Sequence, residues 1–427
     1  MVREVNLSSS ALVILDVQED YLEARGSLKQ VGLKPIEKDQ REVLISNCQR
    51  LMEETRSSGR PVVYVQTVFR SDFADCFFPL EWRRHLDPAS PVLVEGSPGA
   101  AIPKEIAPRE GDFVVTKKSL PAFQFTHLDR LLTGLGVDTC VVCGFCGVAG
   151  SIDDTARMGG LFGYDTVIPA DAVFPVRSPH LKTLVKRAAV METQEVIALM
   201  KAAAFNKKEE IRPALILVAL NNDGNHPLGS KYQYGISGYG SVSEEEREDF
   251  IRNNNRLIEA MTHKGFPVIH AQTAIRFDQA DDAHSTQAGR VLVPEWTRKF
   301  PPGVGYMIEG TWGAEILEGV RLPEGYYRVY KKGNSAFGLT HMNRLLRNLG
   351  VNVCIITGDS TTGCISDTVR EGAGLDYELV LVSDATSLAN IPYHQVLANR
   401  AKVRTTDEVL DWLEKLQPSN RPIAGAA

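Results

Sequence analysis

The chain has 427 residues, so it is too long for one ordinary hydrophobic core and is expected to form two domains of about 200 residues each. Apolar residues make up 43% of it and charged residues 23%, which is the balance of a soluble globular protein. A net charge of -6 and a pI of about 5.9 argue against a nucleic acid or an anionic membrane surface as the main partner.

The first half opens with an apolar run at residues 11–17 that does not alternate with polar residues, which indicates a strand buried on both faces. Asp16 lies at its carboxyl end, where open α/β sheets place their sites. Further strand-like runs alternate with segments of helical period, so the expected core is a parallel sheet flanked by helices. The other strands are expected at 60–67, 113–118, 138–144 and 164–171, the helices at 41–56, 127–135 and 151–158, and a closing strand and helix within 190–200.

The second half repeats the first nearly element for element. The matches that share an offset of 214 are residues 96–100 with 310–314, 126–132 with 340–346, Lys117 with Lys331, and Gly144 with Gly358. The opening strands pair at an offset of 203, so the second half carries 11 extra residues, which we place in 228–244. The charged stretch 207–212 is the natural linker, and the expected domains are therefore 1–206 and 207–427.

The turn that follows the apolar run 351–357 is the most informative stretch of the chain. A strand-like run, a Gly-rich turn and a helix-like segment place Cys364 at the first turn of a helix, where backbone N–H groups and the helix dipole favour a thiolate. A buried structural cysteine is the alternative. The position in a strand-to-helix turn favours the nucleophile.

Seven cysteines in so long a chain are typical of a reducing compartment rather than of a disulfide scaffold. The spacing of Cys140, Cys143 and Cys146 is that of a metal-binding run, but a strand would point alternate side chains to opposite faces, so we interpret these residues as strand packing. No run of about 18 apolar residues occurs, and the N-terminal apolar run lacks a small-residue cleavage site. We therefore expect a cytoplasmic protein that does not bind a membrane.

Three motifs, in this order and present twice, carry a resemblance to a known family. They are the opening ALVILDVQEDY, the lysine segments VVTKKSLPAF and RVYKKGNSAF, and the turn around Cys364. The chain resembles the isochorismatase-like cysteine hydrolase superfamily, which includes nicotinamidases, N-carbamoylsarcosine amidohydrolases, maleamate-type amidases and isochorismatases. The resemblance implies two tandem three-layer α/β/α domains, each with a mainly parallel sheet, packed as an internal pseudo-dimer. It also implies an Asp, Lys and Cys triad at three strand ends, and a non-proline cis peptide that helps to form an oxyanion hole.

Neither half matches the whole triad. In the second half, Cys364 falls on the nucleophile and Lys331 on the lysine, and the backbone N–H groups of Ser360 and Cys364 fall on the oxyanion hole. The expected cis bond is Asp359–Ser360. Ala219 stands where Asp16 stands in the first half, which removes the general base. Asp359 and Asp223 are the candidate substitutes, although Asp223 fits a solvent-facing turn equally well.

In the first half, Asp16 and Lys117 match the triad but no cysteine does. The turn is one residue longer than its partner, so Gly150 or Ser151 takes the nucleophile position, and Cys146 comes too early. Isochorismatases proper protonate a vinyl ether with the strand-end Asp and need no cysteine. Acid catalysis by Asp16 is therefore one interpretation of this half, and an ion pair left from a lost enzyme is the other.

No metal and no cofactor is expected. The zinc-binding Asp-x-His of nicotinamidases has no counterpart, His85 and His284 stand alone, and no phosphate-binding or dinucleotide-binding glycine turn follows a strand. Arg276 is a candidate clamp for a substrate carboxylate, and Trp296 a candidate pocket residue. Alternatively, Arg276 is a solvent-exposed side chain and Trp296 belongs to the interface between the two halves.

The leading hypothesis is a metal-free hydrolase of a small C–N bond (amide, imide, carbamoyl or lactam) that uses Cys364 in the second half. The alternatives are acid catalysis by Asp16 (vinyl-ether cleavage or a non-hydrolytic rearrangement) and a catalytically degenerate binding or scaffold protein. A mixed site in which Asp16 serves Cys364 is a further arrangement to test. The expected partners are a small-molecule substrate and, through the internal pseudo-dimer, other copies of the chain.

Overall fold

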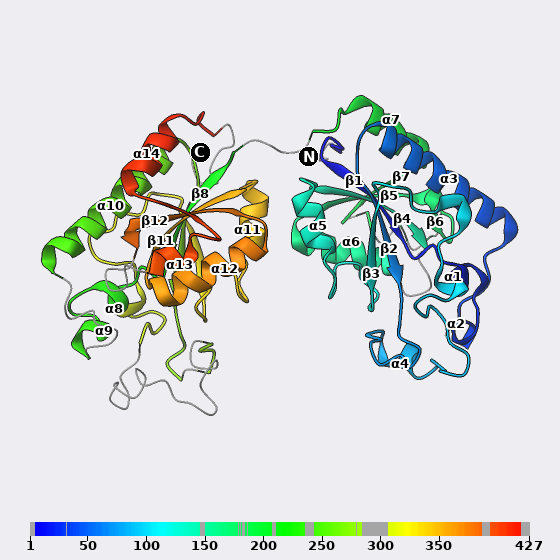
Figure 1. Cartoon of the computed structure of the whole chain (residues 1–427), viewed down its shortest axis with the longest axis horizontal. Helices are drawn as coiled ribbons and strands as arrows, with labels where there is room; N and C mark the ends of the chain where they lie inside the picture. Colours follow the sequence, from blue (N-terminus) through cyan, green and yellow to red (C-terminus); the bar gives the residue numbers. More distant parts are fainter. Residues whose placement is uncertain are drawn as a thin grey trace. The chain divides into compact units, whose positions relative to one another are not determined.

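The computed structural model divides the chain into two compact units, the first unit, Met1–Glu209, and the second unit, Glu210–Ala427 (Figure 1). The structure describes residues 5–30, 32–145, 150–177, 179, 181, 184–185, 187–206, 211–234, 243–278, 280–283, 306–386 and 393–419. Most of the expected linker, 207–212, lies outside these ranges. Within the described residues, no helix combines the length and the apolar character needed to cross a bilayer.

Every strand pair in the sheet of the first unit is parallel, as the alternation of strands and helices predicts. The strands are β1 (Ser10–Leu15), β2 (Val62–Thr67), β3 (Phe113–Lys117), β4 (Thr139–Phe145), β5 (Asp165–Pro169), β6 (Val173–Phe174) and β7 (Ala189–Met191). Their order is β3-β2-β1-β4-β5-β7, with β6 paired to β4. The chain runs outward from β1 to β3 and then returns to β4 on the other side of β1. This reversal makes a switch point between β1 and β4, where α/β sheets leave a crevice.

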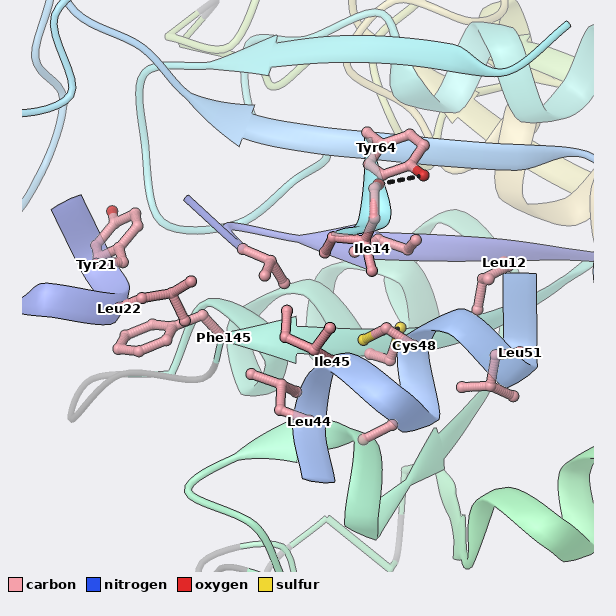
Figure 2. Close-up of a cluster of buried hydrophobic side chains, with 14 of the residues drawn as sticks. Leu12, Ile14, Tyr21, Leu22, Leu44, Ile45, Cys48, Leu51, Tyr64 and Phe145 are labelled. Carbon is pink, nitrogen blue, oxygen red and sulfur yellow. Dashed lines mark hydrogen bonds between the residues drawn. The ribbon is translucent and has the colours of Figure 1, made fainter. Parts of the chain in front are cut away.

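Helices cover both faces of this sheet, which gives the predicted three layers (Figure 1). The helices are α1 (Glu19–Glu23), α2 (Ser27–Gln30), α3 (Lys38–Ser57), α4 (Leu80–Arg83), α5 (Leu128–Gly134), α6 (Ser151–Phe162) and α7 (Thr193–Ala202). Leu12 and Ile14 of β1 pack under α3 and α7, in the cluster that Figure 2 shows, whereas Ala11 and Val13 pack under α5 and α6. Successive strand residues point to opposite faces, so a run without polar residues can fill both clusters.

The same alternation explains the cysteines of β4. Cys140 points into the cluster under α5 and α6, and Cys143 into the one under α3 and α7, where its sulfur lies 3.9 Å from that of Cys48. The two side chains therefore lie on opposite faces of one strand, as the strand-packing interpretation predicts. Cys146 lies outside the described residues.

The second unit repeats this architecture. Its strands are β8 (Pro213–Val218), β9 (Val268–Thr273), β10 (Tyr327–Lys331), β11 (Val353–Gly358), β12 (Glu378–Thr386) and β13 (Lys402–Arg404), in the order β10-β9-β8-β11-β12-β13. All these pairs are parallel. The helices are α8 (Asn222–Asn225), α9 (Ser230–Gln233), α10 (Glu244–His263), α11 (Met342–Leu349), α12 (Ser366–Gly374), α13 (Tyr393–Leu397) and α14 (Thr406–Glu414). α10 and α14 cover one face of the sheet, and α11 and α12 cover the other.

The position of the extra residues in the second unit differs from the prediction. Val268 of β9 matches Val62 of β2 at an offset of 206, so only three of the 11 extra residues precede β9. The rest lie between Asp281 and Met307. The prediction put the extra residues too early because the Gly- and Ser-rich composition of 228–244 resembles an inserted loop. Part of that segment instead forms the helix α9.

Candidate active site

The switch point of each unit lies between two adjacent strand ends, β1 and β4 in the first unit and β8 and β11 in the second. Asp16 and Ala219, the residues that follow β1 and β8, have left-handed φ angles of 53° and 49°. The N–H of each donates to the next strand at 2.9 Å, to Val65 and Ala271 respectively. The second unit therefore retains a costly backbone geometry while lacking the carboxylate that it presents in the first unit.

The turns after β4 and β11 come so close to the neighbouring strand that only glycine fits. Gly144 and Gly358 have φ angles of 118° and 110°. A Cβ atom at these positions would lie 2.2 Å from the carbonyl oxygen of Leu15 and 2.1 Å from that of Val218. Both units therefore bring the turn after the fourth strand against the strand end that holds Asp16 or Ala219.

The first unit brings Asp16, Lys117 and Ser151 together. Lys117 Nζ lies 2.9 Å from Asp16 Oδ2, and it donates to the Ser119 carbonyl at 3.0 Å and to Ser151 Oγ at 3.5 Å. The Thr67 hydroxyl donates to the other carboxylate oxygen, Oδ1, at 2.8 Å. Asp16 and Lys117 are both buried. Asp16 is thus held by an ion pair at Oδ2, which accepts no hydrogen bond, and by a hydrogen bond at Oδ1. The residue facing the lysine carries a hydroxyl instead of a thiol.

The structure also settles which residue of the longer turn faces the lysine. α6 begins at Ser151, and the hydroxyl of Thr155 accepts the N–H of Ala122 at 2.9 Å. Thr368 accepts the N–H of Ala336 at the same distance in the second unit. Thr155 and Thr368 are therefore equivalent, and Ser151 is the counterpart of Cys364.

The second unit places Cys364 against Lys331. Lys331 Nζ donates to Cys364 Sγ at 3.2 Å and to the Gly333 carbonyl at 2.9 Å, and the Asn334 side-chain oxygen lies 3.9 Å from Sγ. Lys331 is fully buried, whereas Cys364 is partly exposed. Burial lowers the pKa of Lys331, and the charge of Lys231 lowers it further, against the opposing effect of the Cys364 thiolate. Lys331 is thus a buried amine that lies beside a thiol and gives up its proton more easily than an exposed lysine.

The turn that carries Cys364 differs from the prediction in one respect. The peptide bond Asp359–Ser360 is cis, as the resemblance implies. Cys364 lies in a π-helical turn, Thr361–Ile365, that directly precedes α12, rather than in the first turn of the α-helix. The N–H of Ile365 donates to the Ser360 carbonyl five residues earlier, at 3.0 Å. π-helical turns of this kind are frequent at functional sites.

A cavity of about 650 Å³ lies next to residues that contact this pair. Its lining includes Gly333 and Asn334, the two residues that contact Lys331 or Cys364, and the charged residues Asp367, Arg370 and Glu371 of α12. A volume of this size suits a small organic molecule. The cavity therefore adjoins the dyad through Gly333 and Asn334, and neither Lys331 nor Cys364 is among the residues that line it.

Of the two substitute carboxylates, Asp223 holds a loop. It is buried rather than solvent-facing, and its Oδ1 accepts the N–H and the hydroxyl of Ser230 at 3.2 and 2.7 Å. Its Oδ2 accepts the N–H of Met307 at 2.7 Å, as Asp20 in the first unit accepts that of Leu93 at the same distance. These contacts fix the loops around the strand end.

The other substitute, Asp359, has a partner that sequence reasoning missed. Lys231 of α9 lies 2.5 Å from Asp359 Oδ2, and its ammonium is 6.0 Å from the centre of the Tyr306 ring. Asp359 is only 1% exposed. An alignment of α9 with α2 would have found Lys231, because Gly26 and Ser27 match Gly229 and Ser230 at the offset of 203, so that a lysine replaces Leu28.

The candidate pocket residues are not brought to either site by the described contacts. The Arg276 guanidinium makes two hydrogen bonds to Asp278, at 3.0 and 2.7 Å, on an exposed loop, as Arg70 does with Asp72 in the first unit. Trp296 and His284 lie outside the described residues. Among the residues that are described, no group of three or more His, Cys, Asp and Glu side chains is placed to hold a metal ion.

Comparison with known proteins finds the same family in both units. The profile of the Isochorismatase domain matches residues 10–198 and 231–412. The uncharacterized isochorismatase family protein YwoC of Bacillus subtilis (strain 168) is 30% identical over 175 residues, 40% of this chain and 79% of its own. The ureidoacrylate amidohydrolase RutB of Serratia proteamaculans (strain 568) is 28% identical over 157 residues, 35% of this chain and 61% of its own. An N-carbamoylsarcosine amidase of Arthrobacter sp is 30% identical over 132 residues, 31% of this chain and 50% of its own.

Proposed function

We propose, from the premise that the chain belongs to the isochorismatase family, that its second unit is a metal-free cysteine hydrolase of a small C–N bond. The observation that carries this proposal is the 3.2 Å contact between Lys331 Nζ and Cys364 Sγ, at a strand end where Ala219 supplies no carboxylate. Two of the relatives are named as an amidohydrolase and an amidase, which supports an amide or carbamoyl group as the substrate.

Lys331 replaces the missing aspartate as the base in this proposal. Its neutral amine accepts the proton of Cys364, and the thiolate attacks the carbonyl carbon of the substrate, forming a C–S bond as the carbonyl π electrons move to oxygen. The backbone N–H groups of Ser360 and Cys364 are the proposed donors to that oxyanion. When the C=O bond re-forms, the C–N bond breaks, and the Lys331 ammonium gives its proton to the leaving nitrogen.

Hydrolysis of the resulting thioester uses the same groups. A water molecule gives a proton to Lys331 and attacks the thioester carbonyl, and collapse of the second tetrahedral intermediate breaks the C–S bond. The products are an amine and a carboxylic acid, and the thiol and the amine of the dyad are regenerated. A lysine can perform both proton transfers only if it changes charge readily, which burial of Lys331 favours.

The first unit lacks the features that support this chemistry. Ser151 faces Lys117, and both oxygens of Asp16 have partners, Lys117 at 2.9 Å and the Thr67 hydroxyl at 2.8 Å. Lys117 is thus committed to an ion pair with Asp16, and no thiol faces it. We therefore propose that the first unit stabilises the chain and that turnover belongs to the second.

The test is hydrolysis of a panel of small amides, ureas, imides and lactams, with mass spectrometry of the intact protein under acid quench. The expected result is turnover of at least one compound with an acyl adduct on Cys364. Cys364→Ala should lose the adduct and at least about 10,000-fold in rate, because nothing else in the site can form the thioester. Full turnover by Cys364→Ala, with loss in Asp16→Asn, would instead assign the reaction to the first unit.

A further inference from the structure

The wall of the site differs between the two units in a coordinated way. In the first unit, Leu28, Val92 and Phe145 are buried members of one apolar cluster. Tyr21 belongs to the same cluster, and its ring stacks on that of Phe145 with 5.2 Å between centroids; Figure 2 labels both residues. Side chains therefore fill this side of the strand ends in the first unit.

The matching positions in the second unit follow from shared contacts. α2 and α9 begin at matched serines, and Leu93 and Met307 both have left-handed φ angles, of 56° and 52°, with N–H groups that bind the matched aspartates. The turns start from the matched glycines Gly144 and Gly358. The counterparts of Leu28, Val92, Phe145 and Tyr21 are thus Lys231, Tyr306, Asp359 and Gly224.

These replacements form a polar cluster in place of an apolar one. Lys231 and Asp359 are paired at 2.5 Å, with the Tyr306 ring beside the ammonium. A Cβ atom on Gly224 would lie 3.4 Å from Asp359 Oδ2 and 3.7 Å from Lys231 Nζ. A Cβ atom here would already be in van der Waals contact with both members of the pair, so the glycine leaves room beside the ion pair where the first unit has an aromatic side chain.

We propose that Lys231 is a positioning residue for the Lys331–Cys364 dyad. Its ammonium, held by Asp359, provides a second positive charge that favours the thiolate form of Cys364. It does so in a site where Ala219 supplies no carboxylate. This inference rests on the proposed function of the second unit and adds a residue that lies outside the family triad. A buried cation next to a lysine is one of the ways in which proteins obtain a neutral, basic amine.

The electrostatic effects agree with this arrangement. Burial lowers the pKa of Lys231, but the Asp359 carboxylate, Tyr306 and the Cys364 thiolate together outweigh burial and raise that pKa above its ordinary value. Burial and the thiolate raise the pKa of Tyr306 to about 12, against the opposing charge of Lys231. Lys231 thus stays charged, and Tyr306 stays protonated, at neutral pH.

The groups that act on this cluster come from every element around it. They are Asp359 and Cys364 on the turn after β11, Lys331 at the end of β10, Tyr306 on the loop before the short helix at Trp312–Ala314, Asp223 on α8, Tyr232 on α9, Arg247 on α10 and Asp367 on α12. Lys231 and Asp359 can be changed separately, and their charges act on the thiol with opposite signs.

The experiment measures the rate at which iodoacetamide alkylates Cys364 as a function of pH, by mass spectrometry of its peptide. Lys231→Met removes a positive charge and leaves Asp359 unbalanced, so the midpoint of the profile should rise by about one pH unit, with alkylation about tenfold slower below it. Asp359→Asn leaves Lys231 unbalanced, so the midpoint should fall. The double variant should lie between the two, and Lys231→Arg should restore the wild-type profile.

A purely structural role would not shift the two midpoints in opposite directions, because a loosened loop would shift the midpoint of both variants in the same direction. Cys354, which is fully buried, should stay unreactive in every variant and reports that the unit is folded. Equal or absent shifts in folded variants would overturn the role of Lys231 and leave the hydrolase intact. If iodoacetamide failed to alkylate Cys364 in the wild-type protein, that result would instead contradict the proposed function.

Discussion

The two units use one backbone arrangement to hold different charges. At the strand end of the first unit, Asp16 pairs with Lys117 at 2.9 Å beside the apolar side chains of Tyr21 and Phe145. In the second unit the corresponding carboxylate is gone, and a carboxylate and a lysine instead occupy the volume of the apolar side chains. The comparison teaches that a buried lysine at this position can have either an aspartate or a thiol as its neighbour, and that only the second arrangement contains a thiol.

The lysine of the dyad offers the largest expected effect. Lys331→Met should lower the rate of turnover, or of Cys364 alkylation at neutral pH, by about 100-fold to 10,000-fold, because it removes the proposed base and the charge beside the thiolate. The measurement is the rate of either reaction for folded protein. Lys402→Met, which removes an exposed surface lysine paired with Glu378, is the matched control and should leave the rate unchanged. An equal loss in both variants would indicate general damage rather than a role for Lys331.

The ion pair of the first unit should affect stability and leave the chemistry of the second unit unaffected. Asp16→Asn leaves the buried Lys117 ammonium without its carboxylate, which we expect to cost about 3–5 kcal/mol of unfolding free energy. Hydrogen exchange with mass spectrometry can assign that loss to peptides of β1 to β4. Alkylation of Cys364 at 25 °C should be unchanged. A large fall in the rate of Cys364 alkylation would instead indicate that Asp16 contributes to the reactivity of Cys364.

A smaller, pH-dependent difference concerns β2 and β9. Tyr64 of β2 donates to the Ile106 carbonyl at 2.8 Å, whereas its counterpart His270 is buried, and burial lowers the pKa of His270 from 6.5 to about 3. Because the unfolded chain then binds a proton that the folded unit excludes, the second unit should lose stability as pH falls below about 6.5, by up to about 1.4 kcal/mol per pH unit. His270→Tyr should flatten this dependence in urea titrations between pH 7 and pH 4. A slope identical to wild type would contradict a neutral buried His270.

The fold was predictable from the sequence because its signals are local and occur twice. Apolar runs such as 11–17 alternate with helical segments, and the shared offset of 214 aligns Lys117 with Lys331 without any structure. The pairing of Lys331 with Cys364 follows from the family resemblance, whereas the sequence left Gly150 and Ser151 as alternatives opposite Lys117.

The rest of the site depends on contacts between distant segments. Lys231 and Asp359 are 128 residues apart, and a short helix such as α9 carries no periodic pattern that would place it beside the turn after β11. The π-helical form of the turn at Thr361–Ile365 was likewise not predicted from the sequence. Asp223 was expected to fit a solvent-facing turn equally well because its local sequence is polar, although the fold buries it.

The central claim is that the second unit holds a thiol activated by a lysine alone. The most direct measurement is the rate constant for alkylation of Cys364 by iodoacetamide at pH 7, relative to N-acetylcysteine under the same conditions. We predict that Cys364 in the wild-type protein reacts faster than this reference, and that Lys331→Met makes it slower than the reference. A wild-type Cys364 that reacts no faster than the reference, or that is unaffected by the loss of Lys331, would contradict the account.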